Sequence, residues 1–188
     1  MTTTGLRLLY GLGAALDRCR VLAYCRILLA VETAVFLFLV AGTHGLIVPL
    51  AGPTSTDFVS FYAAGALADA GTPELAYDQT AHDAAEQRAT AAGIEYRFFY
   101  YPPAFLLLCA LFARLPYLAA FLLFEAATLA LCLIVMREIL ADRAWSAIIP
   151  VLAFPAAFWT LGLGQNSFLT AALFGAGTLW IDRRPILA

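Results

Sequence analysis

The feature that most constrains this chain is residues 27–50, which are almost wholly apolar. A helix of that length rises about 36 Å, and the hydrocarbon core of a bilayer is only about 30 Å thick. Composition points the same way, because 63% of the residues are hydrophobic and only 13% are charged, about half the charged share of soluble domains. The sequence therefore predicts an all-α integral membrane protein, with residues 1–188 forming a single membrane domain.

The number of further spans depends on a short apolar segment, residues 104–113. Its ten residues cover about 15 Å as a helix, half of the hydrocarbon core. If this segment does not cross, the arginines near residues 140 and 183 lie on the same side as the four arginines before residue 27. The positive-inside rule favours that arrangement. We expect about four transmembrane helices, at 27–50, 117–136, 146–161 and 166–181, in a multi-pass inner (plasma) membrane protein with a cytoplasmic N-terminus.

Residues 51–116 are then an extracytoplasmic loop. Residues 51–100 carry seven acids and only two arginines, a balance typical of a non-cytoplasmic segment. Asp57 is expected to cap a helix that runs to about Ala70. A second helix is expected from Thr80 to Gly93, with Asp83 in a near capping box and with His82 and its acidic neighbours on a solvated face. Both helices are too short to span and are expected to lie on the outer membrane surface as amphipathic helices.

This topology gathers three polar groups on the outer side. They are Asp57, the cluster of Arg97, Tyr100 and Tyr101, and the turn at Gln165 and Asn166. A carboxylate such as Asp57 can accept the proton of a substrate hydroxyl within hydrogen-bond reach. Arginine and tyrosine side chains can bind a phosphate, and asparagine and glutamine side chains can bind sugar hydroxyls. The candidate binding residues are Tyr62, Arg97, Tyr100, Tyr101, Gln165 and Asn166.

Each of these residues also has an ordinary structural interpretation. Asp57 can simply cap a helix, and the two tyrosines can belong to an interfacial aromatic belt. Arg97 can pair with Glu95 alone. Glu125, inside a predicted span, is harder to explain, because a carboxyl group at that depth usually faces a protein interior.

Several chemistries find no support in the sequence. There is no Walker motif, no GxGxxG turn in a strand–helix context and no HExxH. We therefore expect no nucleotide cofactor and no dedicated metal site, although a divalent metal stays open. The chain contains no lysine and no basic face, so no nucleic-acid partner is expected.

Three segments together resemble glycosyltransferase family 87, whose members are membrane enzymes of the GT-C superfamily. They occur in the family's order and are TDFVSFYAAGALADAGTPELAYD, FYYPPAFLLLCALFARLPYLAA and GLGQNSFLTAALFGAGTLWIDRRPILA. The resemblance covers roughly residues 30–188, and each motif is weak when taken alone. Here Gln165 is followed directly by Asn166, which fits the family's Gly-Gln turn only loosely.

The resemblance implies a GT-C-like helical bundle in which Asp57 is the catalytic base. The donor would be a polyprenyl-phosphate sugar, as in polyprenol-phosphate-mannose-dependent mannosyltransferases. The acceptor would be a hydroxyl of a lipid or glycan on the outer face of the membrane. Family members are considerably longer, so we expect this sequence to be the N-terminal part of a larger protein.

Two other functions remain open at this stage. The chain could be a non-catalytic membrane scaffold or assembly subunit derived from the same fold. It could also be a small transporter, which would need polar groups near the middle of the membrane, and only Glu125 meets that requirement.

Overall fold

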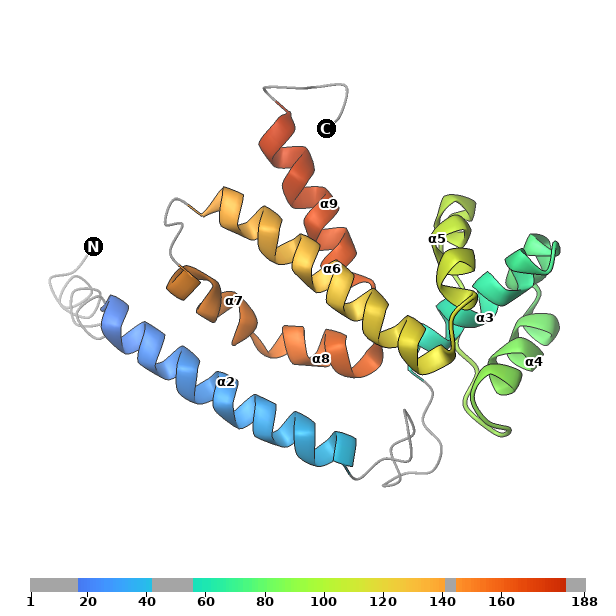
Figure 1. Cartoon of the computed structure of the whole chain (residues 1–188), viewed down its shortest axis with the longest axis horizontal. Helices are drawn as coiled ribbons and strands as arrows, with labels where there is room; N and C mark the ends of the chain where they lie inside the picture. Colours follow the sequence, from blue (N-terminus) through green and yellow to red (C-terminus); the bar gives the residue numbers. More distant parts are fainter. Residues whose placement is uncertain (1–16, 42–55, 141–144, 182–188) are drawn as a thin grey trace, which may run out of the picture.

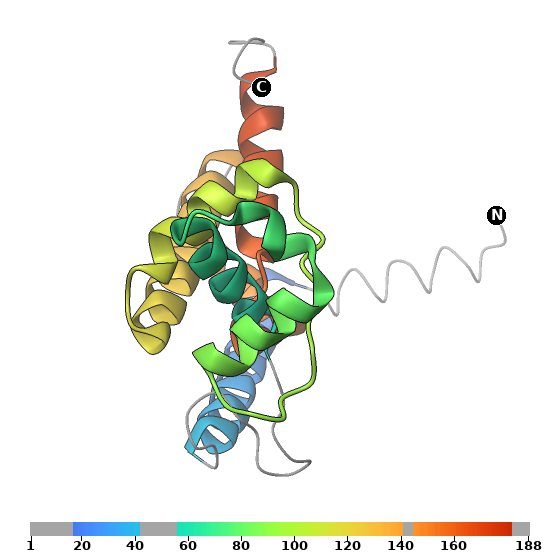
Figure 2. The same ribbon diagram turned by 90° about the vertical axis from the view of Figure 1, so that its right-hand side faces the viewer.

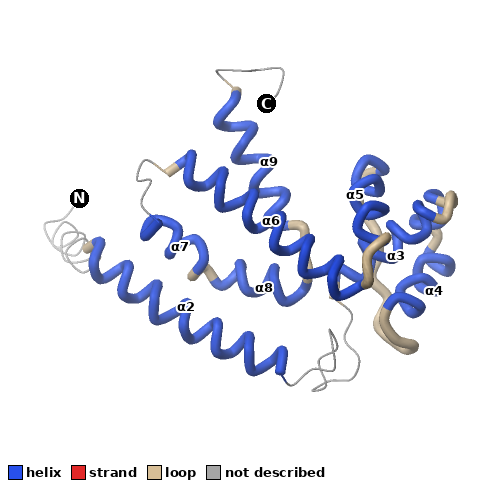
Figure 3. Tube along the Cα trace, in the orientation of Figure 1, coloured by secondary structure: helices blue, strands red, loops and turns tan. Residues whose placement is uncertain are grey.

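The computed structural model describes residues 17–41, 56–140 and 145–181, apart from the side chains of 38–41 and 145. Every regular element in those ranges is a helix, as Figure 3 shows. The predicted all-α class is therefore confirmed. The elements, in chain order, are α2 (Arg18–Ala41), α3 (Asp57–Asp69), η1 (Pro73–Tyr77), α4 (Gln79–Ala89), α5 (Pro103–Ala113), α6 (Tyr117–Ile139), η2 (Trp145–Ile148), α7 (Ile149–Leu152), α8 (Pro155–Leu163) and α9 (Ser167–Trp180).

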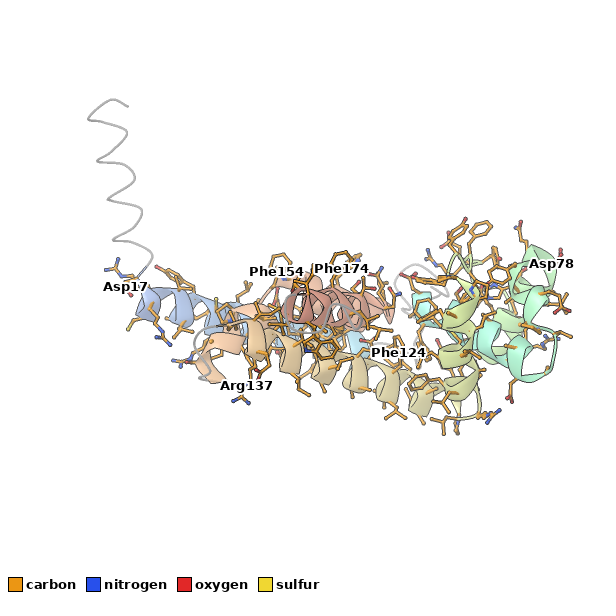
Figure 4. All side chains as sticks on the ribbon, turned by 90° about the horizontal axis from the view of Figure 1, so that it is seen from above. Asp17, Asp78, Phe124, Arg137, Phe154 and Phe174 are labelled. Carbon is orange, nitrogen blue, oxygen red and sulfur yellow. The ribbon has the colours of Figure 1, made fainter. Side chains whose placement is uncertain are left out.

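The molecule is elongated, with α3, α4 and α5 gathered at one end (Figure 1). Helix α6 starts at that end and leads away from it, and α7 and α8 lead back. Seen from above, Asp17 and Arg137 lie toward the opposite end from Asp78 (Figure 4). The start of α2 and the end of α6 therefore lie toward the same end of the molecule.

One helix of the described residues, α6, is long and apolar enough to cross a membrane by itself. A second span results if the pair Ser146–Leu152 and Pro155–Leu163 is counted as one broken helix. The two parts are bent by 61°, and the bend falls at Pro155, one of the two prolines that interrupt the segment predicted as a span at 146–161. Pro155 is the physical reason, because its ring lacks an amide donor and starts a new helix after the break at Ala153 and Phe154. The predicted count of four spans stays a prediction.

Helix α2 differs from the predicted first span in position. It begins at Arg18, nine residues before the expected start, and is described as far as Ala41. Residues 42–50, the last part of the predicted span, lie outside the described residues. The arginines of residues 18–26 continue the helix because arginine is a good helix former, and Asp17 accepts a hydrogen bond from the Arg20 amide at 2.8 Å.

Residues 56–113 fold into a compact helical unit, which we call the outer unit and which faces the viewer in Figure 2. Helix α3 is its centre and packs against α5, α4 and η1. Phe58 is 1% exposed and Phe61 is 3% exposed. The expectation that α3 is an amphipathic helix is therefore wrong, whereas its place relative to the membrane stays a prediction. Apolar and small residues occur all round this helix, and such a helix belongs in an interior.

The packing of α3 on α5 depends on Gly65. A Cβ atom at this position would collide with the backbone carbonyl of Cys109 on α5. The missing side chain lets the two backbones approach closely, which alanine would prevent. This approach fixes how α5 sits on the helix that begins at Asp57.

Helix α4 begins at a different residue from the one predicted. Asp78 is its N-cap, and the Asp78 carboxylate accepts a hydrogen bond from the Ala81 amide at 2.8 Å. The capping box that we placed at Thr80 and Asp83 is wrong. Aspartate is a stronger capping residue than threonine, and Asp78 stands directly after the η1 turn.

Helices α6 and α9 form the second core. Cys132, Val135, Phe168 and Ala172 are buried between them. A Cβ at Gly175 would lie 2.6 Å from Val135 Cγ1, so this glycine allows the close crossing of the two helices. The crossing places the N-terminus of α9 next to the beginning of the outer unit.

Candidate active site

Asp57 is the first residue of α3, and Thr56 is the N-cap. The Thr56 side chain makes no capping bond; its hydroxyl lies 3.2 Å from the Tyr117 hydroxyl at the start of α6. The prediction that Asp57 caps α3 is therefore wrong by one residue. A carboxylate in the first helical turn is still stabilised by the helix dipole.

The Asp57 carboxylate meets a side chain that is 108 residues away in the sequence. Nε2 of Gln165 donates a hydrogen bond to Asp57 Oδ2 at 2.7 Å. The Ser167 hydroxyl lies 3.4 Å from Gln165 Oε1, to which it donates. The side-chain amide of Gln165 therefore donates to the Asp57 carboxylate and accepts from the Ser167 hydroxyl. The two outer polar groups predicted from the topology, Asp57 and Gln165, are in contact.

Gln165 is held in place by the turn that ends α8. Gly164 adopts a left-handed conformation with φ of 67°, which glycine tolerates best. The amides of Gly164 and Gln165 both donate to the Thr160 carbonyl, at 2.9 and 3.1 Å. A Cβ at position 164 would lie 2.5 Å from Cβ of Phe58. The turn is thus packed directly on the residue that follows Asp57.

Phe58 packs between the Gly164 turn and helix α6. Its ring contacts Phe121 and Phe124 of α6 at centroid distances of 5.4 and 5.5 Å. Buried aromatic pairs at such distances stabilise a fold by about 1 kcal/mol beyond the area that they bury. Phe58 therefore connects the Asp57 end of α3 to the span α6.

Among the candidate tyrosines, Tyr101 is the one whose pKa responds to the charge of Asp57. Its ring packs on Phe61 at 5.0 Å and on Phe105 at 4.9 Å. Burial raises the pKa of the Tyr101 hydroxyl, and the negative charge of Asp57 raises it further. The phenol is therefore kept in its protonated form, which can donate a hydrogen bond.

The other two candidate tyrosines are placed differently. Tyr100 is 81% exposed, and its ring stacks on Phe98 at 5.3 Å. The Tyr62 hydroxyl donates to the Leu115 carbonyl at 2.8 Å, so it ties α3 to the connection between α5 and α6. The structure thus turns Tyr100 outward and gives Tyr62 a structural contact.

Arg97 is engaged in the outer unit. Its guanidinium pairs with Glu95 at 3.1 Å, the ordinary interpretation considered above. Its backbone amide donates to Glu86 Oε2 at 3.0 Å. About a third of the Arg97 side chain is exposed to solvent.

His82 and Glu86 contradict the prediction of a solvated helix face. Both side chains are completely buried, at 0% exposure. They lie with Ala85 on the face of α4 that packs against α3. The spacing of His82, Ala85 and Glu86 at i, i+3 and i+4 is the signal that could have revealed a buried face.

Asn166 lines an open groove at the start of α9. The groove has a volume of about 420 Å³ and is lined by Asn166, Ser167, Thr170, Ala171 and Phe174. Its wall carries polar groups near Gln165 and an apolar ring, Phe174, two turns further along the helix. The groove therefore adjoins the Asp57–Gln165 contact.

Two other features bear on the chemistry. Across the described ranges, no cluster of three or more His, Cys, Asp or Glu side chains could hold a metal ion.

Glu125 is 4% exposed, and neither of its carboxylate oxygens has a hydrogen-bond partner among the residues described. It lies one residue after Phe124, on the buried stripe of α6.

Comparison with models of known protein families gives one match. Residues 99–188 match the family model of glycosyltransferase family 87. The similarity to glycosyltransferase family 87 therefore covers slightly less than half of the chain. The match includes Tyr100, Tyr101, Gln165 and Asn166, whereas Asp57 and Arg97 lie before it. No curated protein and no solved structure matches the chain.

The glycosyltransferase family 87 match confirms the resemblance found in the sequence. It gives glycosyl transfer as the general activity, with a sugar donor and an acceptor as substrates. It also agrees with the membrane location that the apolar helix α6 indicates.

Proposed function

We propose that this protein is a GT-C-type hexosyltransferase whose catalytic base is Asp57. In this proposal the enzyme transfers a hexose from a polyprenyl-phosphate donor to a hydroxyl of a lipid or glycan acceptor. Mannose is the proposed hexose. The reaction takes place on the outer face of the inner membrane. The observation that supports it most is the contact between Asp57 and Gln165, since it joins the outer unit to the family-matched turn.

The chemistry is a single displacement with inversion. The acceptor hydroxyl gives its proton to the Asp57 carboxylate while its oxygen bonds to the anomeric carbon of the sugar. The bond from that carbon to the phosphate oxygen breaks, and polyprenyl phosphate leaves. Because Gln165 donates to one carboxylate oxygen, it fixes the carboxylate plane and leaves the second oxygen for the acceptor, as a positioned general base requires.

The donor phosphate is assigned to Arg97, Tyr100 and Tyr101. A guanidinium forms strong charge-assisted hydrogen bonds with phosphate, and the Tyr101 phenol stays protonated beside Asp57. Arg97 would exchange Glu95 for the phosphate, which is feasible because Glu95 is 71% exposed and the pair is only weakly stabilising. Tyr62 supports this group indirectly by tying α3 to Leu115.

The sugar is assigned to the groove beside Asn166. Its amide and the hydroxyls of Ser167 and Thr170 offer donors and acceptors for sugar hydroxyls. The ring of Phe174 offers an apolar surface further along α9. A substrate with a polar head and a lipid tail fits this order of groups.

The test is transfer of radiolabelled mannose from a polyprenyl-phosphate donor in membranes that contain the full chain. Asp57→Asn keeps the volume and removes the base, so we expect a rate loss of about a hundredfold or more. Asp69→Asn on the same helix is the matched control. It breaks the partly exposed pair with Arg114 at 2.7 Å, which should cost at most about 1 kcal/mol and leave the rate nearly unchanged.

Two results would count against the proposal. Equal rates for the wild type and Asp57→Asn would remove Asp57 as the base. A stable, folded wild-type chain that neither binds nor uses any polyprenyl-phosphate sugar would instead favour the scaffold or assembly role.

A further inference from the structure

Helix α4 contains two buried ionisable side chains that the proposed reaction does not use. His82 Nε2 lies 3.1 Å from the Ser60 carbonyl oxygen of α3, and Glu86 Oε2 accepts the Arg97 amide at 3.0 Å. His82 and Glu86 are also close to each other, with 3.7 Å between Nδ1 and Oε1. The pair therefore lies between α3, which His82 contacts, and the segment that carries Arg97, which Glu86 contacts.

The two atoms that face each other in this pair both lack a hydrogen-bond partner among the described residues. His82 Nδ1 and Glu86 Oε1 are both buried, and neither has a hydrogen-bond partner among the described residues. With Nε2 donating to the Ser60 carbonyl, Nδ1 of a neutral imidazole is an acceptor. A proton on Glu86 would let its hydroxyl donate to Nδ1 and would satisfy both atoms at once. An uncompensated buried polar atom costs about 1–3 kcal/mol.

We propose that His82 and Glu86 are positioning residues that share one proton and thereby hold the Asp57 helix and the Arg97 segment in register. Ser60 is three residues after Asp57, so the His82 contact is one helical turn from the carboxylate. The Glu86 contact holds the backbone of Arg97 itself. This inference rests on the proposed function, because the register matters for catalysis only if Asp57 and Arg97 act on substrate.

The surrounding charges are consistent with a shared proton. Burial raises the pKa of Glu86 to about 7, and the charge of Asp83 adds to it, whereas the amide and the charge of Arg97 oppose the rise. Burial lowers the pKa of His82, against the effects of the Ser60 carbonyl and Asp83. Burial raises the pKa of the Tyr96 hydroxyl, and the charge of Glu86 in turn contributes to the rise. The Tyr96 and Tyr117 hydroxyls are the further titratable groups within the electrostatic reach of Glu86 among the described residues.

The sign of the pH dependence follows from linkage. The folded pKa of Glu86 lies above its ordinary value of 4.5, so protonated Glu86 favours the closed unit. That stability is complete below about pH 4.5 and is lost as the pH rises through about 7. For a locally opened state in which Glu86 titrates normally, the opening constant should rise about tenfold between about pH 6 and about pH 8.

The experiment is hydrogen–deuterium exchange of the full chain in lipid nanodiscs, without substrate. Peptides covering α3 and residues 94–101 are followed at both pH values and corrected for the exchange rate of the unstructured peptides. In the wild type we expect about a tenfold loss of protection between the lower and the higher pH. Glu86→Gln, which carries a permanent amide donor in place of the carboxyl proton, should show no such loss. Glu74→Gln, an exposed change in the same unit, should behave as the wild type.

Protection in the wild type that does not change with pH, or the same change in Glu86→Gln, would overturn the proposal. The wild-type titration decides this even if Glu86→Gln fails to fold. The positioning role adds a second readout. The kcat/KM of mannose transfer should fall over the same pH interval in the wild type and stay level in Glu86→Gln, and a fall of equal size in both would refute it. Absence of transfer in the wild type contradicts the proposed function, whereas the exchange result still tests the shared proton.

Discussion

At the scale of residues, the contact between Asp57 and Gln165 depends on Gly164. The left-handed φ of 67° turns the chain at the end of α8, and the missing side chain lets the turn rest on Phe58. The sequence revealed the turn, because Gly-Leu-Gly-Gln-Asn follows an apolar segment. It could not reveal that Gln165 rather than Asn166 contacts Asp57, since both are amides and the difference is set by the geometry of the turn.

Gly164→Ala tests this dependence. A left-handed conformation costs an alanine about 1–2 kcal/mol, and here the new methyl would also press on Cβ of Phe58 at 2.5 Å. Gly71→Ala is the matched control, because Gly71 has a φ of 84° and open space around it. We expect Gly164→Ala to lower the free energy of unfolding by about 2 kcal/mol more than Gly71→Ala, measured by denaturant unfolding in detergent. Equal losses would show that the contact with Phe58 contributes nothing.

The same scale explains two incorrect expectations. Thr56 and Asp57 are both good capping residues, so the sequence could not say which one precedes the helix. His82 and Glu86 are polar and were placed on a solvated face, yet the packing of α4 on α3 buries both. Burial of a polar helix face is decided by the neighbour that covers it, which is distant in the sequence.

At the scale of elements, the outer unit is held together by α3. Its small residues let α5 and α4 pack closely on it. The start of α3 at Asp57, the helix α5 and the span α6 were all predicted nearly at their observed bounds, because proline and apolar periodicity mark them. The bend between α7 and α8 is harder to foresee, since prolines can either kink or end a helix.

Gly65→Ala tests the packing of α3 on α5. The new methyl would collide with the Cys109 carbonyl, which belongs to a backbone and cannot move aside cheaply. We expect destabilisation of about 3 kcal/mol, the upper range for an overpacked core. Gly162→Ala is the control, because its methyl would meet only the Phe36 ring at 3.8 Å and alanine favours a helix by about 0.5–1 kcal/mol. Thermal unfolding in detergent should lower the Tm of the first variant and leave the second unchanged or raise it.

At the scale of the whole molecule, the membrane orientation that the charges predict stays a prediction. The outer unit lies at one end, and Arg137 and the start of α2 lie toward the other (Figure 4). Arginine near the cytoplasmic ends of spans is the positive-inside pattern. The arginines at 183 and 184, which complete that pattern in the sequence, lie outside the described residues.

Cysteine labelling in intact cells tests the orientation. Cys19, at the exposed start of α2, is expected to react with a membrane-impermeant maleimide only after the membrane is permeabilised. A cysteine introduced by Glu74→Cys, in the exposed part of η1, is expected to react without permeabilisation in a Cys19→Ser, Cys25→Ser background. The reverse pattern would place the outer unit in the cytoplasm and contradict the proposed side of the reaction.

The sequence by itself determined the all-α class, the approximate bounds of α3, α5 and α6, and the resemblance of residues 99–188 to glycosyltransferase family 87. These depend on local composition and on the spacing of apolar residues, which a linear pattern carries. Only the tertiary structure decided that Gln165 contacts Asp57 and that His82 and Glu86 are buried. Those facts depend on which surfaces meet, and contacts between distant segments arise only when the close approaches at Gly65, Gly164 and Gly175 bring the helices together.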